Sequence, residues 1–133
     1  MQEDYFIRQL KNVSKVLAII LGLSDKGKLE EAIEISEQAL KSEFGLADDF
    51  SVEEIKIQLA SDKLYLDDLK QLLAIVMLRA NLFTEKNKDL ASAEFSKALE
   101  IITLFQDKSM TFDFSILQKK AEILENLHKT NKL

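Results

Sequence analysis

The stretch GKLEEAIEISEQAL, residues 27–40, decides the fold class of this chain. Its apolar and small residues recur at intervals of three and four positions, and acidic residues fill most of the positions between them. This spacing lines the apolar side chains along one side of an α-helix, which turns about once every 3.6 residues. We therefore expect an amphipathic helix over residues 29–44, closed by Gly45, with an inner stripe formed by Leu29, Ala32, Ile33, Ser36, Ala39 and Leu40.

The overall composition extends this helical prediction to the whole chain. The 133 residues include three glycines and no proline. Proline breaks helices, and glycine supplies the positive backbone angles of tight hairpin turns. The composition therefore argues against an all-β sandwich, a collagen-like chain and a nucleotide enzyme with a glycine-rich loop. A chain of this length suits one domain, so we expect a single all-α domain over residues 1–133.

Breakers and helical periodicity predict about six helices in this domain. The first should end at Gly22, in the left-handed conformation that closes many helices. Ser51 should open the third, because a glutamate follows three residues later in the spacing of a capping box. The six expected helices cover residues 4–21, 29–44, 51–60, 67–84, 89–105 and 112–129.

The last predicted helix carries apolar residues on more than one side. We expect its inward face to hold Leu117, Ala121 and Leu124. Two phenylalanines lie near the preceding turn, in residues 110–114. They suit either a hydrophobic staple against the last helix or an exposed apolar spot that pairs two subunits. The residues that flank the expected inward face are Ile116, Ile123 and Leu127.

Two parts of the chain share an enclosed apolar helix, a short polar turn and then an amphipathic helix with alanines seven residues apart. Ala32 and Ala39 have this spacing, and so do Ala91 and Ala98, with the aromatic Phe95 between the second two. Both stretches resemble the second helix of a tetratricopeptide repeat. The resemblance implies two stacked antiparallel helical hairpins, over residues 4–44 and 67–105, with a short inserted helix at 51–60 and a capping helix at 112–129.

The resemblance is to a degenerate form of this repeat. Ile20 stands where the repeat usually has a small residue, and no proline follows either hairpin. Residues 45–66 also interrupt the repeat period of about 34 residues. The segments 4–10 and 20–23 are in addition similar to a small bacterial family of helical proteins to which no function is assigned.

The lack of cysteine, the length of the uncharged stretches and the start of the chain indicate the cellular compartment. The chain has no cysteine, which excludes disulfides, thiolate nucleophiles and zinc–thiolate clusters. Its longest uncharged stretches, residues 16–24 and 71–78, are too short to span a bilayer. The start is acidic, and no small-residue cleavage site follows the first apolar run. We therefore expect a cytoplasmic protein.

The net charge of −5 is concentrated in one segment. Between residues 30 and 54, Lys41 is the only basic residue among nine acidic ones. Such a segment repels the phosphates of nucleic acids and anionic lipids, so we expect neither nucleic acid nor membrane partners. Two interpretations remain open for these acids: they line the solvent face of a helix and cap the next one, or they bind a basic partner.

Catalytic chemistry finds little support in the sequence. The single histidine, His128, forms one Glu-x-x-His pair with Glu125, whereas a helical di-metal site needs two. Residues 48–54 hold four acids that could bind a hard cation, but they lack the spacing of a calcium loop. We therefore expect no enzyme activity, catalytic residue, cofactor or metal. A carboxylate-based metal-binding or enzymatic bundle, using Glu122 and Glu125 near His128, stays as an alternative.

The remaining hypothesis is a protein-interaction or adaptor module that binds another protein or a peptide, with a helical domain that senses a small ligand as the alternative. The tetratricopeptide resemblance implies a groove lined by the first helix of each hairpin. That groove either binds an apolar segment or is closed by the inserted and terminal helices. The places that match a carboxylate clamp in that family hold Leu17, Leu21, Val76 and Ala80, so no clamp is expected.

Polar residues on otherwise apolar helices are the candidate site. Arginine and tyrosine often anchor interaction surfaces. The alternative is a structural role, with the arginine snorkelling and the tyrosine hydroxyl at the rim of the core. The sequence leaves the oligomeric state open between a monomer and a homodimer. The predicted partner-binding residues are Tyr5, Arg8, Asn12, Arg79 and Asn81.

Overall fold

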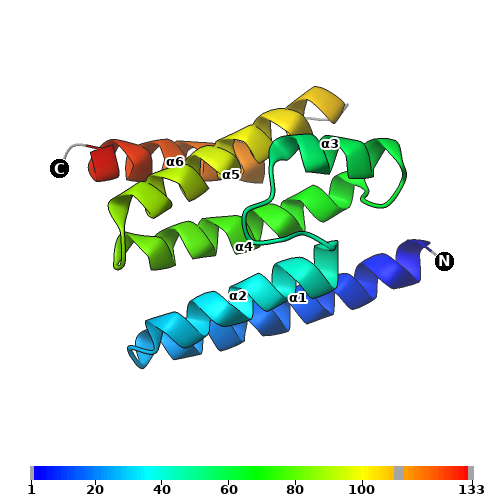
Figure 1. Ribbon diagram of the computed structural model, residues 1–133. Helices are drawn as coiled ribbons and strands as arrows, with labels where there is room; N and C mark the ends of the chain where they lie inside the picture. The colour runs from blue at the N-terminus through cyan, green and yellow to red at the C-terminus, as the bar shows by residue number, and fades with distance from the viewer. Residues whose placement is uncertain (1, 110–112, 132–133) are drawn as a thin grey trace. The chain divides into compact units, whose positions relative to one another are not determined.

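The computed structural model describes residues 2–109 and 113–131, with side chains described for residues 7–109 and 113–130. Within these ranges the chain forms six α-helices and no strand, which confirms the all-α prediction (Figure 1). The helices are α1 (Gln2–Asp25), α2 (Leu29–Phe44), α3 (Val52–Ala60), α4 (Leu66–Thr84), α5 (Lys88–Lys108) and α6 (Phe114–Asn131).

Two of the predicted helix ends are confirmed by their cap geometry. Gly45 ends α2 with a φ of 65°, and its N–H donates to the Lys41 carbonyl at 3.0 Å. Ser51 caps α3, because its hydroxyl accepts the Glu54 N–H at 3.3 Å. Both caps satisfy backbone groups that a helix leaves without a partner at its ends.

The predicted helix end at Gly22 is wrong. The helix α1 continues through Gly22 to Asp25, and the left-handed glycine is Gly27, with a φ of 74°. The N–H of Gly27 donates to the Ser24 carbonyl at 3.0 Å. The N–H of Lys28 donates to the Leu23 carbonyl at 2.9 Å. The helix ends where its last carbonyls receive these donors, one turn beyond the glycine that the sequence indicated.

The chain divides into two compact units, Met1–Ile75 and Val76–Leu133, and the boundary falls within α4. In the first unit, α1 and α2 pack along each other as an antiparallel hairpin, as the blue and cyan helices in Figure 1 show. Two small residues of α2, Ala32 and Ala39, are buried. The other large contributors to the core of this unit are Val13, Ile20, Leu40, Phe50, Ile55 and Leu72.

The second unit comprises the rest of α4, together with α5 and α6. The helices α5 and α6 pack against each other. Ala91, Phe95 and Ala98 are buried, so the seven-residue alanine spacing marks an inner face of α5. This agrees with the sequence prediction for that helix.

The predicted inward face of α6 is wrong. Leu117, Ala121 and Leu124 are exposed, whereas Ile116 and Ile123 are buried. These two sets lie on adjacent sides of one helix, and only one side packs against α5. The sequence marks both sides as apolar, so periodicity alone could not identify the side that the rest of the unit covers.

Across the described residues, every helix is too short or too polar to cross a lipid bilayer.

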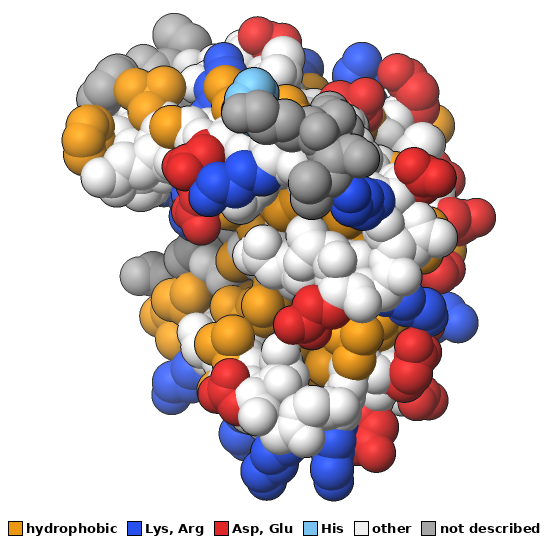
Figure 2. Space-filling model, turned by 90° about the vertical axis from the view of Figure 1, so that its left-hand side faces the viewer, with side chains coloured by type: hydrophobic (Ala, Val, Ile, Leu, Met, Phe, Trp, Pro, Cys, Tyr) orange, Lys and Arg blue, Asp and Glu red, His pale blue; other side chains and the backbone are white. Residues whose placement is uncertain are grey.

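The face drawn in Figure 2 carries acidic and basic side chains, with hydrophobic side chains in orange between them. The single histidine, in pale blue, is at this surface.

Candidate functional site

A pocket of about 280 Å³ lies in the first unit, between the outer side of α2 and the segment that follows it. Four of its lining residues are spaced at positions i, i+3, i+4 and i+7 of α2, which places them on one side of the helix. The other three come from the segment after Gly45. The lining residues are Glu34, Glu37, Gln38, Lys41, Leu46, Ala47 and Asp48.

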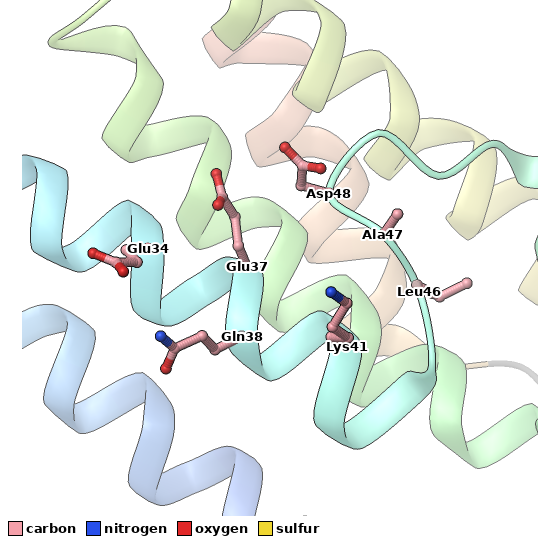
Figure 3. Close-up of a pocket in the computed structure, with 7 residues that line it drawn as sticks. All are labelled: Glu34, Glu37, Gln38, Lys41, Leu46, Ala47 and Asp48. Atoms are coloured by element: carbon pink, nitrogen blue, oxygen red, sulfur yellow. The ribbon is translucent and has the colours of Figure 1, made fainter.

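The charge of the pocket is predominantly acidic. Three of its seven residues are carboxylates, and Lys41 is its only cation. Figure 3 shows the side chains of Glu37 and Asp48 on the same side of the pocket, one from the helix and one from the following segment. Carboxylates that two elements bring to the same side create a region of negative potential that attracts a cation.

The shape of this pocket depends on residues that the solvent does not reach. The left-handed Gly45 reverses the chain at the end of α2, and the Leu46 N–H donates to the Leu40 carbonyl at 3.0 Å. Leu46 and Phe50 are each 1% exposed. These two apolar side chains anchor the ends of the segment that carries Asp48.

The predicted site residues on α1 have mixed outcomes. Arg8 and Asn12 are both exposed, and they are four residues apart, so they lie on one side of the helix. The backbone of Tyr5 belongs to α1, but its side chain is outside the described residues. Arg8 and Asn12 therefore present a short polar strip, and their role in binding stays a prediction.

The predicted site residues on α4 are not both on the surface. Asn81 is exposed, whereas the side chain of Arg79 is only 3% exposed. The buried Arg79 has an acidic partner, because its Nε lies 3.4 Å from Oε2 of Glu94. Its role is therefore structural in this unit, and it does not form part of an exposed binding surface.

A cluster of charged groups surrounds this arginine in the second unit. Both carboxylate oxygens of Glu94 are used, because Lys97 Nζ lies 3.2 Å from Oε1. The guanidinium of Arg79 also lies 5.1 Å from the centroid of the Phe83 ring, in the range of a cation–π contact. The cluster joins α4 to α5 and explains how two charged side chains are accommodated in the interior.

A second buried polar group, Asp68, lies at the amino end of α4 in the first unit. Its Oδ2 accepts the Tyr65 N–H at 2.7 Å, which satisfies a free donor at the helix start. Gln9 reaches the same region from α1, and its Nε2 donates to the Glu43 carbonyl at 3.3 Å. Burial raises the pKa of Asp68, although hydrogen bonds from Tyr65 and Gln9 oppose this effect.

The raised pKa of Asp68 predicts an unusual pH dependence of stability. The fold favours the neutral carboxyl of Asp68. Below the ordinary pKa of 3.8 this preference stabilises the folded state fully, and the stabilisation is lost as the pH rises through the raised pKa. In Asp68→Asn the side chain cannot ionise. We expect the stability of this variant relative to the wild type to increase from acidic to neutral pH.

Urea unfolding of both proteins over this pH range measures the effect. Asp89→Asn is the matched control, because Asp89 lies in the first turn of α5 and is exposed. A stability difference between Asp68→Asn and the wild type that is constant with pH, or that falls as the pH rises, would contradict the prediction.

Among the described residues, no group of three or more histidine, cysteine, aspartate or glutamate side chains is placed to hold a metal ion. The three pocket carboxylates, Glu34, Glu37 and Asp48, therefore do not form such a group.

Comparisons with protein-family models, curated proteins and solved structures gave no match. The resemblance to tetratricopeptide repeats and to a bacterial helical family stays a prediction from the sequence.

The sequence predicted the acidic segment of the pocket but not the pocket itself. The signal was the recurrence of Glu34, Glu37 and Lys41 on one side of the predicted helix. The contribution of Asp48 could not be predicted in this way, because it depends on how Gly45 turns the chain back along α2.

Proposed function

We propose that the chain is a non-enzymatic protein-interaction module, and that its acidic pocket receives a lysine or arginine side chain of a protein or peptide partner. The observation that carries the proposal is the pocket between α2 and the following segment, where three carboxylates line a volume of about 280 Å³. Sites for small molecules commonly have volumes of about 300–1,000 Å³, so a single long side chain is a better match.

The lining residues suit both parts of such a side chain. Lysine and arginine combine an apolar stem with a charged end. The exposed Ala47 provides apolar surface, and Glu37 and Asp48 provide opposite charge. Lys41 repels a second cation and so favours a partner segment in which one basic residue enters the pocket. The acidic residues around the pocket, in the segment 30–54, increase the attraction for a basic partner.

Peptide binding tests this proposal with Glu37→Lys. The probe is a fluorescently labelled alanine-based peptide that carries one arginine, compared with the same peptide carrying glutamine instead. We expect the arginine peptide to bind, and Glu37→Lys to weaken its affinity by about tenfold or more, because the pocket then holds two cations and only two carboxylates. Fluorescence anisotropy measures both affinities.

The matched control is Glu31→Lys, because Glu31 is exposed on the same helix and does not line the pocket. Both variants change the net charge of the protein equally. We expect the control to bind within about threefold of the wild type. Equal losses of affinity in the two variants would mean that only the net charge of the protein matters, which contradicts binding in the pocket. Failure of the arginine peptide to bind better than the glutamine peptide would also overturn the proposal.

A further inference from the structure

The helix α6 has a second apolar side that the described residues do not cover. Phe114, Leu117 and Leu124 are 64%, 37% and 49% exposed, although each is a large hydrophobic residue. The side that packs on α5 carries the fully buried Ile116 and Ile123 instead. An exposed row of large apolar side chains on a soluble helix usually marks an interface.

The spacing of the exposed row is that of a coiled-coil seam. Its residues follow one another at intervals of three, four, three and four positions, which is the a and d pattern of a seven-residue repeat. This repeat keeps the row on one narrow side of the helix. Starting at position a, the row consists of Phe114, Leu117, Ala121, Leu124 and His128.

Flanking charges indicate which helix fits against this row. Lys120 and Glu125 occupy the g and e positions, on opposite edges of the seam. In a parallel pair of identical helices, a residue at g lies beside the residue at e of the next repeat in the partner. Lys120 of each copy would therefore meet Glu125 of the other, and symmetry forms this ion pair twice.

The alternative orientation loses this complementarity. In an antiparallel pair, e positions face e positions and g positions face g positions, so Glu125 would meet Gln118 and Lys120 would meet Leu127. Within one chain, Glu125 pairs only with the exposed Lys129 on its own helix among the ion pairs described, at 3.2 Å. Such surface pairs contribute little and can exchange for a better partner.

We infer that α6 is a homodimer interface, in which two copies of the chain associate in parallel through the exposed row 114–128. The row spans 15 of the 18 residues of α6, or about 22 Å, and a helix of this length would be marginal in isolation. Here α5 already holds α6 in its helical form, so dimerisation does not have to order the helix. The inference concerns α6 alone and does not depend on the acidic pocket.

Analytical ultracentrifugation over a range of protein concentrations tests the interface. We expect the wild-type chain to convert to twice its monomer mass as the concentration rises, and Leu124→Glu to remain a monomer. The matched control is Ile57→Glu, because Ile57 lies on α3 and is 65% exposed. This control makes the same kind of change at a more exposed apolar residue, and it should dimerise like the wild type.

A charge exchange tests the parallel orientation. Lys120→Glu should weaken dimerisation by about tenfold or more, because it places two acidic residues together at each edge. The double variant Lys120→Glu/Glu125→Lys should restore dimerisation, because the pair is re-formed with its charges reversed. Lys119→Glu is the control, since Lys119 lies outside the seam positions. Circular dichroism confirms that all variants are folded.

Several outcomes would overturn the inference. A wild-type chain that stays monomeric at high concentration excludes the homodimer. A dimer that survives Leu124→Glu but is lost in Leu21→Glu uses the exposed apolar residues of α1 instead. A dimer that the charge exchange does not restore is not parallel. Peptide binding to the pocket is measured separately, so it can succeed or fail independently of these results.

Discussion

Replacing Glu94 with alanine should lower the free energy of unfolding by about 3–5 kcal/mol. Its carboxylate contacts both Arg79 and Lys97, and the side chain of Arg79 is buried. Removing this carboxylate takes away the acidic partner 3.4 Å from a buried positive charge, and desolvation of that charge then opposes folding more strongly. Urea denaturation followed by circular dichroism at neutral pH measures the change.

A second variant separates charge compensation from packing. In Arg79→Met/Glu94→Met both charges are replaced by apolar side chains, so most of the lost stability should return. The matched control is Glu100→Ala, because Glu100 is exposed on the same helix and should change stability by less than about 0.5 kcal/mol. Glu94→Ala with a stability close to that of Glu100→Ala would show that the buried ion pair is not compensating a charge.

Replacing Phe50 with alanine should also lower the free energy of unfolding by about 3–5 kcal/mol. Phe50 lies between helices, yet it is only 1% exposed. It directly precedes the cap residue Ser51, and Ile55, four residues after the cap, is fully buried. This is the arrangement of a hydrophobic staple, so truncation leaves a cavity and releases the start of α3.

Urea denaturation again measures this effect, with Ile57→Ala as the control because Ile57 is exposed on α3. The affinity for the arginine peptide should fall in Phe50→Ala as well, since Phe50 anchors the segment that carries Asp48. A stability loss below about 1 kcal/mol would mean that the segment is not fixed by this side chain.

Local rules predicted most of the helix ends. The caps at Gly45 and Ser51 depend on short-range geometry that a few neighbouring residues determine, so the sequence predicted both correctly. Gly22 shows the limit of such rules: a glycine can be accommodated in the last turn of a helix, and the helix ends only where the next backbone donors fall.

Longer-range features of the site could not be predicted from the sequence. Arg79 was identified as a polar residue in an apolar helix, but its burial depends on Glu94, which is 15 residues away on another helix. The covered side of α6 likewise depends on α5, because Ile116 and Leu117 are equally apolar neighbours in the sequence. Phe50 carried a signal that could have been used, since the staple spacing to Ile55 is visible in the sequence.

Buried residues shape the pocket and exposed residues line much of it, and this difference affects how the pocket can evolve. Its outline is determined by Gly45, Leu46 and Phe50, whereas lining residues such as Glu34 and Lys41 are exposed on the outer side of α2. Exposed helix positions tolerate substitution with little change in stability. Mutation can therefore alter the charge and the shape of this pocket while the fold that supports it is retained.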